Sequence, residues 1–216
     1  SGTLQYTGST ASTDRAFTLT ASTTGTIDVT QSGTTLTISG ASANTTGALT
    51  KIGSGTLTLG AANLYTGLTT VTAGTLTEGI ANALSSGALT VNGGTFNIGA
   101  YSDTVGAVTI GTSGGTISGT TGVLTGTSYT FNNTTTATVS AKLGGSTVGL
   151  TQAGSGTTTL SADNTYTGVT TINAGTLSVA TIGNGGVAGN LGQATNAASN
   201  IVIGGGTLQY TGSTAS

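Results

Sequence analysis

The 216-residue chain contains no cysteine, histidine, methionine, tryptophan or proline, and only eight of its side chains carry a formal charge. Without cysteine or histidine, the chain has no thiol nucleophile and none of the usual protein ligands of transition metals. The lack of cysteine leaves the redox compartment open, because exported proteins can also do without disulfides. The lack of cysteine and histidine therefore excludes thiol catalysis and the usual transition-metal chemistry.

Basic residues are scarce as well. Three Lys and Arg residues stand against five Asp and Glu, and the net charge is −2. This leaves no basic patch for phosphates, so nucleic acid is not an expected partner. No apolar run approaches the roughly 20 residues that a membrane span needs. The sequence also shows neither a signal peptide nor an initiating Met, which is expected of an excerpt from a longer chain.

Sustained helical periodicity is missing too. No window has a 3.6-residue apolar stripe with helix caps, so no helix is predicted. Short period-two alternations occur instead, separated by Gly-rich turn signals, and each predicts a strand. The predicted strands include residues 4–6, 17–19, 27–29, 36–38, 57–59, 89–91, 96–98, 108–110, 177–179 and 201–203.

Small and β-branched residues make up most of the chain, with 54 Thr, 39 Gly and 22 Ser. Such a composition is typical of flexible linkers only when apolar residues are missing. Here apolar alternations run from end to end, which predicts an ordered all-β protein.

The sequence repeats at two scales. The eleven residues from Gly2 to Ser12 (GTLQYTGSTAS) return from Gly206 to Ser216, at an offset of 204 residues. Within that unit, Ser54–Leu76 returns as Ser155–Leu177, with 16 of 23 positions identical. The predicted organisation is one tandem unit over residues 1–204, made of two halves of about 100 residues, with residues 205–216 starting the next unit.

A tandem array of short strands predicts a parallel β-helix, or β-solenoid, rather than a sandwich, which needs longer strands and a closed set of partners. Inward Leu, Ile, Val and Ala would fill each coil, and outward positions would be mostly Thr. Charged residues are disfavoured because coils about 4.8 Å apart would stack like charges. At ~20 residues per coil, the unit would hold about ten coils and rise roughly 48 Å. The expected outward positions are Thr18, Thr37, Thr58, Thr90 and Thr109.

Residues 55–67 (GTLTLGAANLYTG) and 69–76 (TTVTAGTL) closely resemble the autotransporter-associated β-strand repeat, also called the passenger-associated transport repeat. The second copy, residues 162–168 and 170–177, is more similar still. Leu64 and Thr158 depart most clearly from the family pattern. The resemblance implies a right-handed parallel β-helix in a large bacterial surface or secreted protein, typically a passenger or stalk, but it does not define a molecular activity.

A chain exported through a narrow pore in the unfolded state would benefit from this composition. Disulfide reshuffling and prolyl isomerisation are slow steps in folding, and a chain without cysteine or proline avoids both. Secretion to the bacterial surface or the extracellular space is therefore expected on physical grounds as well.

A search for catalytic or binding residues yields no site. The acidic residues lie more than ten positions apart, although folding could bring some together, and the three basic residues are scattered. Calcium at Asp103 or Asp163 was weighed, but the Gly-rich repeats of calcium-binding β-rolls are missing. We predict no catalytic, cofactor or metal-binding residue, no cofactor, and no enzyme activity. The charged residues are Asp14, Arg15, Asp28, Lys51, Glu78, Asp103, Lys142 and Asp163.

Two features leave binding interpretations open. Tyr65 and Tyr166 are equivalent, as are Tyr6 and Tyr210, and these rings would either stack on sugars or, more commonly, pack over a turn with an anchored hydroxyl. Outward Thr-x-Thr pairs resemble the faces of ice-binding solenoids, which need Thr in every coil. The irregular spacing of the strands in the sequence argues against such a continuous Thr face.

The sequence at neither end resembles a solenoid cap. The resulting hypothesis is a structural extracellular fibre or stalk of a giant bacterial repeat protein, whose partners are further copies of itself, joined end to end or side by side. The alternative is an adhesin-type surface that binds glycan or ice.

Overall fold

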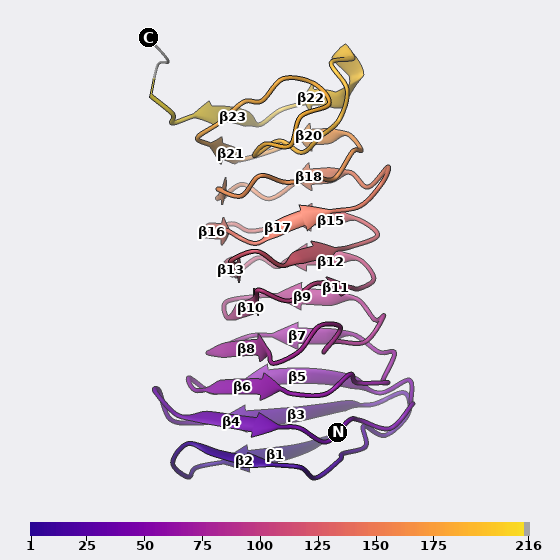
Figure 1. Cartoon of the computed structure of the whole chain (residues 1–216). Coiled ribbons are helices and arrows are strands. Elements are labelled where there is room, and N and C mark those ends of the chain that lie inside the picture. Colours follow the sequence, from indigo (N-terminus) through magenta and orange to yellow (C-terminus); the bar gives the residue numbers. More distant parts are fainter. Residues whose placement is uncertain (214–216) are drawn as a thin grey trace.

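The computed structural model describes residues 1–213, and its strands stack into one column of coils (Figure 1). Two ten-stranded parallel sheets run along the column, and each coil contributes one strand to each sheet. Sheet 1 contains β1 (Gly2–Tyr6), β3 (Thr24–Val29), β5 (Ala48–Ile52), β7 (Thr69–Val71), β9 (Leu89–Val91), β12 (Val108–Ile110), β15 (Tyr129–Phe131), β18 (Leu150–Gln152), β20 (Thr170–Ile172) and β22 (Ile201–Ile203). Sheet 2 contains β2 (Ala11–Thr13), β4 (Thr35–Ile38), β6 (Thr56–Leu59), β8 (Thr75–Glu78), β10 (Thr95–Gly99), β13 (Gly115–Gly119), β16 (Thr136–Val139), β19 (Thr157–Leu160), β21 (Thr176–Val179) and β23 (Thr207–Tyr210).

A short third sheet joins three of the middle coils. Sheet 3 consists of β11 (Asp103–Thr104), β14 (Val123–Thr125) and β17 (Lys142–Gly144). The prediction of no helix is confirmed for residues 1–213, whose one helical feature is a single 3₁₀ turn, η1 (Ala198–Asn200). In the described part of the chain, no helix is long and apolar enough to cross a membrane.

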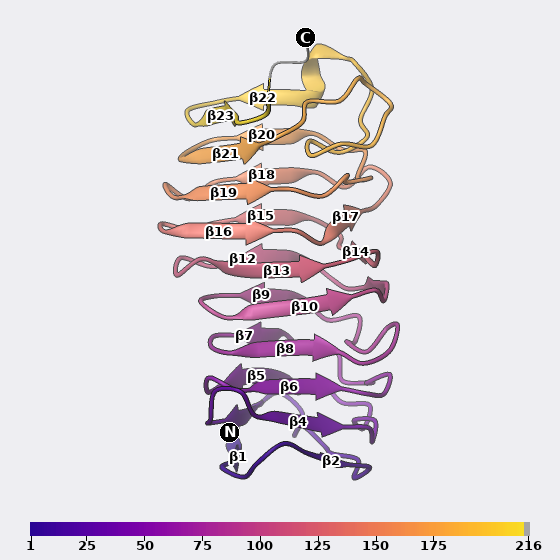
Figure 2. The ribbon, with the colours of Figure 1, turned by 60° about the vertical axis from the view of Figure 1, so that its left-hand side comes forward.

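The coil is right-handed. As the chain rises in Figure 2, the strands of sheet 2 run to the right in front, and those of sheet 1 run to the left behind. This hand is the one that parallel crossover connections adopt almost without exception. The predicted right-handed parallel β-helix is confirmed.

Successive coils pair in register, so that each side chain lies on a counterpart one coil away. Along sheet 2, Leu36 pairs with Leu57, Leu57 with Leu76 and Leu76 with Phe96, and all four side chains are buried. The alternating partners point outward and are mostly Thr. The core is therefore a column of apolar layers enclosed by the sheets.

Nearly all the predicted strands are observed, but residues 17–19 are an exception. Phe17 makes only an isolated bridge to Ser42, and no strand forms there. Leu19 turns into the core, and added side chains at Gly25 or Gly47 would collide with it. The alternation correctly predicts an inward side chain at this place. The backbone, however, turns a corner between the two sheets instead of forming a strand.

Gly74 and Gly175 occupy equivalent turns that lead into β8 and β21. Both have a φ of +58°, in the left-handed region that glycine enters without a Cβ penalty. A Cβ at Gly175 would also lie too close to the backbone carbonyl oxygens of Gly154 and Gly156 in the coil below. Equivalent glycines in the two halves thus serve both the turn and the close stacking of coils.

We expect Gly175→Ala to lower the free energy of unfolding by more than Gly99→Ala. Gly99 has a nearly identical φ of +59°, but a Cβ there would meet open space. Gly99→Ala should therefore cost only the left-handed backbone penalty of about 1–2 kcal/mol, whereas Gly175→Ala adds a steric clash. Urea denaturation of the two variants measures the difference, and equal losses would show that coil stacking does not require this glycine.

Candidate functional site

The polar residues of the repeated segment turn into the solenoid. The amide oxygen of Asn63 accepts a hydrogen bond from the Ser42 N–H at 2.9 Å, and its amide nitrogen donates to the Ala83 carbonyl at 2.8 Å. In the second half, the amide oxygen of Asn164 accepts from the Leu143 N–H at 2.8 Å, and its nitrogen donates to the Asn190 carbonyl at 2.8 Å. Each buried Asn thereby joins the coil below to the coil above.

The two equivalent tyrosines are buried as well. Tyr65 and Tyr166 are completely inaccessible to solvent, and their hydroxyls lie 2.6 Å and 2.8 Å from the hydroxyls of Thr69 and Thr170. Burial raises the pKa of both phenols, and the nearby carboxyl groups of Asp103 and Glu78 add to the effect on Tyr65. Packing over a turn with an anchored hydroxyl is confirmed for this pair, which therefore offers no ring face to a sugar.

Tyr6 and Tyr210 belong to the coils at the two ends of the described chain. Each hydroxyl donates to a backbone carbonyl three residues further on, that of Ser9 for Tyr6 and that of Ser213, at 3.0 Å, for Tyr210. The anchored-hydroxyl prediction is confirmed for these two rings as well, although Tyr210 remains 49% exposed.

Lys51 lies in the core, whereas the sequence indicated only that it is one of three scattered basic residues. Its ammonium donates to the carbonyls of Ile52 at 2.6 Å, Gly53 at 2.9 Å and Ala73 at 3.3 Å. Burial lowers its pKa to about 8, although the charge of Asp28 acts in the opposite direction. The equivalent Gln152 donates to the carbonyl of Gly154 at 2.9 Å, so a buried donor closes the same turn in both halves.

Glu78 and Asp103 are brought together inside the solenoid although they are 25 positions apart in the sequence. Both side chains are only 2% exposed. One oxygen of Asp103 accepts a hydrogen bond from the Leu84 N–H at 2.9 Å, whereas neither oxygen of Glu78 receives one from an N–H or O–H of residues 1–213. Burial and the neighbouring Asp103 carboxyl raise the pKa of Glu78 to about 10, so Glu78 is protonated at neutral pH. Burial also raises the pKa of Asp103.

This acid pair has the perturbed protonation of many active sites but not their access to solvent. Asp103 borders a cavity of about 310 Å³, together with Asn63, Tyr65 and Asn82. No His or Cys exists in the chain, and no group of three potential metal-ligating acids forms within residues 1–213. The arrangement is suited to holding one proton between two buried carboxyls, and it supplies no second acid or base to a substrate.

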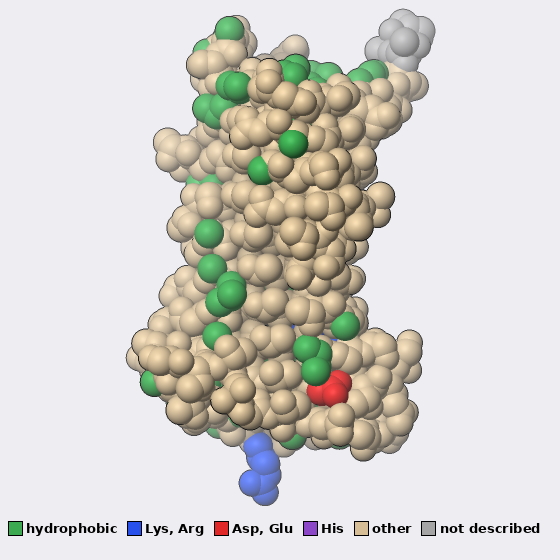
Figure 3. All heavy atoms as spheres, turned by 180° about the vertical axis from the view of Figure 1, so that it is seen from behind, with side chains coloured by type: hydrophobic (Ala, Val, Ile, Leu, Met, Phe, Trp, Pro, Cys, Tyr) green, Lys and Arg blue, Asp and Glu red, His purple; other side chains and the backbone are tan. Residues whose placement is uncertain are grey.

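The other charged side chains do not gather into a site. Asp14, Arg15 and Asp163 are exposed, and Lys142 is half-buried. Asp28 accepts a hydrogen bond from the side-chain amide of Gln5 at 3.0 Å. Figure 3 shows a face that is almost entirely neutral, with its charged side chains near the N-terminal end.

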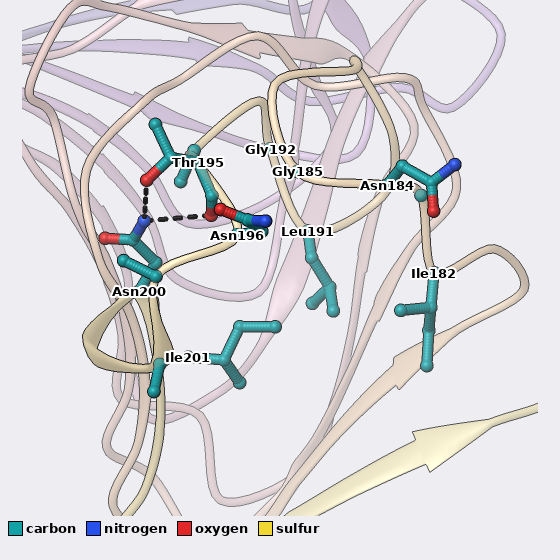
Figure 4. Close-up of a pocket in the computed structure, with 13 residues that line it drawn as sticks. Ile182, Asn184, Gly185, Leu191, Gly192, Thr195, Asn196, Asn200 and Ile201 are labelled. Carbon is teal, nitrogen blue, oxygen red and sulfur yellow. Dashed lines mark hydrogen bonds between the residues drawn. The ribbon is translucent and has the colours of Figure 1, made fainter.

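The most irregular surface lies between β21 and β22. This connection has 21 residues, whereas the equivalent connection between β8 and β9 has ten. The longer connection encloses a cavity of about 340 Å³ in which the side chains of Ile182, Leu191 and Ile201 surround an apolar floor (Figure 4).

Amide groups line the rim of the same cavity. Asn200 donates to the Thr195 carbonyl at 2.9 Å and to the Thr195 hydroxyl at 2.8 Å, which fixes one wall (Figure 4). Asn184 and Asn196 also line the cavity. No lining residue is ionisable, so the cavity can hydrogen-bond a neutral polar ligand but cannot perform acid–base chemistry.

Outward Thr residues form a continuous column on sheet 1. Nine successive coils each place a Thr in the central position, and the tenth places Val202 there. The members are Thr3, Thr26, Thr50, Thr70, Thr90, Thr109, Thr130, Thr151 and Thr171. A column of seven Thr crosses sheet 2, from Thr35 to Thr159. The irregular strand spacing in the sequence predicted that no such column would form; that prediction is wrong, because differences in coil length are taken up in the connections.

Comparison with known proteins identifies the repeated segment. The family model of the passenger-associated transport repeat matches residues 49–77 and 150–179, which are the equivalent parts of the two halves. Two segments of the chain thus match this repeat, and each covers two successive coils, from β5 to β8 in the first half and from β18 to β21 in the second.

A longer segment is similar to a curated protein. Over 68 residues, or 32% of this chain, the sequence is 44% identical to the adhesin BmaC autotransporter of Brucella suis biovar 1 (strain 1330). The aligned segment covers 2% of that protein's length. No solved structure matches the chain.

Replacing Glu78 should make the protein more stable at neutral and alkaline pH. Folded Glu78 keeps its proton up to about pH 10, whereas in the unfolded chain it ionises near its ordinary pKa of 4.5. Between these values unfolding releases a proton, so the free energy of unfolding falls as pH rises. Glu78→Gln keeps a donor for Asp103 and removes this titration. The variant should match the wild type at pH 4 and exceed it increasingly towards pH 9.

Urea denaturation from pH 4 to pH 9 measures this difference. Lys51 titrates in the opposite sense, since its lowered pKa makes stability rise with pH above about 8, but both proteins contain Lys51 and its contribution cancels. Asp163→Asn, at an exposed carboxylate, is the matched control. Parallel wild-type and Glu78→Gln profiles would show that Glu78 is ionised in the folded protein.

Proposed function

We propose, from the two segments that match the passenger-associated transport repeat, that this chain is a structural segment of a bacterial passenger at the cell surface or in the extracellular space. The observation that carries the proposal is in-register coil stacking, which uses the polar residues of the repeat inside the solenoid. Asn63 and Lys51 donate to backbone carbonyls of the next coil, and the Tyr65 hydroxyl is bonded to Thr69 inside the solenoid, so these side chains build the column.

The proposed role is mechanical reach. A solenoid lengthens by one coil at a time, and each coil contacts only its neighbours, so length is added without a change in the cross-section. The scarcity of charge on the described surface and the lack of a second acid or base beside Glu78 and Asp103 support a role without catalysis. The division into 204-residue units, and further copies of the chain as partners, belong to the same proposal.

The similarity to an adhesin supports a second candidate, in which the surface itself binds. The specific observation in its favour is the column of nine Thr on sheet 1, which repeats one hydroxyl and one methyl at every coil. Such spacing, about 4.8 Å along the column, suits a periodic partner such as ice. The amide-lined cavity between β21 and β22 is the corresponding candidate for a glycan.

The structural role is tested by contour length. Proteins containing one, two and three tandem copies of residues 1–204 should appear in electron micrographs as straight rods that lengthen by roughly 45 Å per copy, given nine or ten coils at about 4.8 Å each. Copies joined by a flexible Gly/Ser linker are the control, since they should bend at the junction. Compact particles that do not lengthen with copy number would contradict the proposal.

The ice-binding candidate is tested on the Thr column. The wild-type protein should slow ice recrystallisation, and Thr90→Tyr, in the middle of the column, should abolish that effect because a large ring interrupts the periodic surface. Thr104→Tyr places the same ring at an exposed position outside the columns and should leave the effect unchanged. Ice growth that the wild-type protein does not alter would remove this candidate.

A further inference from the structure

The same eleven residues begin in different sheets at the two ends of the molecule. In the N-terminal copy, residues 2–6 form β1 in sheet 1, paired with β3. In the C-terminal copy, residues 207–210 form β23 in sheet 2, paired with β21. Residues 214–216 of the second copy lie outside the described residues.

The local structure of the two copies is nevertheless alike. In both, the Tyr hydroxyl donates to the carbonyl of the Ser three residues on, and the intervening Gly lies against the Tyr ring. The sequence therefore fixes a strand followed by a turn but does not select the sheet.

The residues that precede each copy account for the difference. Before the C-terminal copy, Ile201–Ile203 forms β22 and occupies sheet 1, which sends the following TLQY strand into sheet 2. At the other end, the corresponding edge of β3 in sheet 1 is occupied by β1 itself. The edge of β3 can pair with β1 or with a β22 strand from a second copy, but not with both.

We propose that β22 and β23 of one copy stack on β3 and β4 of a second copy, displacing β1 from sheet 1 and β2 from sheet 2. The inference rests on the proposed function, because it describes how copies of the structural segment join. The Gly2–Tyr6 sequence would then leave sheet 1; where two copies are continuous, it is the strand of sheet 2 that follows β22. The occupant of each end is thus another copy of this chain.

The exposed end strands match each other in register and polarity. Ile203 lies on Ile172, and stacking β3 on β22 in the same register places Ile27 on Ile203, which extends an apolar column of the core. The outward column continues in the same way from Thr171 through Val202 to Thr26. Ile201, Val202 and Ile203 are 41%, 40% and 59% exposed at the free end, so this contact would bury them.

The first coil is packed less completely than the coils above it. Leu4 occupies the core column one coil below Ile27 but remains 52% exposed. A cavity of about 370 Å³ lies between β1 and the turn that contains Phe17 and Leu19. Coils in the middle of the column bury their inward side chains completely, so displacing β1 removes less well-packed surface than displacing one of their strands would.

The stacking also fixes the number of coils in a unit. Each sheet of this chain has ten strands, but β1 and β22 would compete for one position, so a 204-residue unit contributes nine coils. Its axial length would be about 43 Å at ~4.8 Å per coil, rather than the 48 Å expected from an average coil of 20 residues.

Cysteine pairs can locate these strands, because the chain contains no cysteine of its own. In a two-copy protein, Val202→Cys in the first copy and Thr26→Cys in the second would lie on adjacent parallel strands. Adjacent strands are about 4.8 Å apart, within the Cα separation of about 4.4–6.8 Å that a disulfide tolerates. Oxidation should therefore link this pair in most molecules.

A matched pair reports on β1. Thr3→Cys and Thr26→Cys should form a disulfide in the one-copy protein, where Thr3 pairs with Thr26, and should fail to form it within the second copy of the two-copy protein. Retention of the Thr3–Thr26 disulfide there, with no Val202–Thr26 link, would overturn the inference. If that result came with rods of the expected length, the structural role would stand and only the stacking would fail; compact particles would remove both.

Discussion

In-register pairing of every coil with the next is the constraint on which the rest of this molecule depends. Each side chain lies about 4.8 Å from its counterpart in the next coil. A residue type that occupies a column is therefore in contact with identical or similar side chains above and below it. Thr, Leu, Ile and Val tolerate such repetition, and stacked Thr and apolar residues can even gain from it. Charges do not, and the few that occur are either exposed away from the columns or held inside with partners.

The same constraint decides what happens to polar residues in the core. The interior of a solenoid is closely packed, so an inward amide, phenol or ammonium must find its hydrogen-bond partners among the surrounding backbone and side chains. Asn164 and Lys51 do this with two or three hydrogen bonds each. A repeat that carries these residues therefore encodes a way of building coils, which explains how it can occur in proteins with different activities.

Much of the fold could be predicted because its signal is local. Period-two alternation placed strands such as β6 and β9 correctly, and the absence of a helical stripe left only the short turn η1 unforeseen. The strand predicted at residues 17–19 is wrong because an inward side chain at a corner produces the same apolar–polar–apolar alternation as one in a strand. The strands of sheet 3 could not be predicted in this way, because their sequences, such as Val-Leu-Thr in β14 and Lys-Leu-Gly in β17, do not alternate.

The acid pair and the Thr columns could not be predicted for a different reason. Whether Glu78 meets Asp103, or Thr90 meets Thr109, depends on how many residues each connection takes up outside the strands, and that number varies from coil to coil. The position equivalent to Glu78 in the second half is Val179. Comparison of the two halves therefore does not predict a buried carboxyl at this position. Only the register of the folded coils supplies that information.

The long connection between β21 and β22 shows how freely this architecture admits insertions. Eleven residues more than in the equivalent connection of the first half leave the pairing of β20 with β22 and of β21 with β23 intact. Loop length at this corner is thus decoupled from ladder continuity, as expected when closure entropy grows only slowly with length. The corner is accordingly a natural grafting point, where a foreign peptide could be displayed at a fixed height on a rigid support.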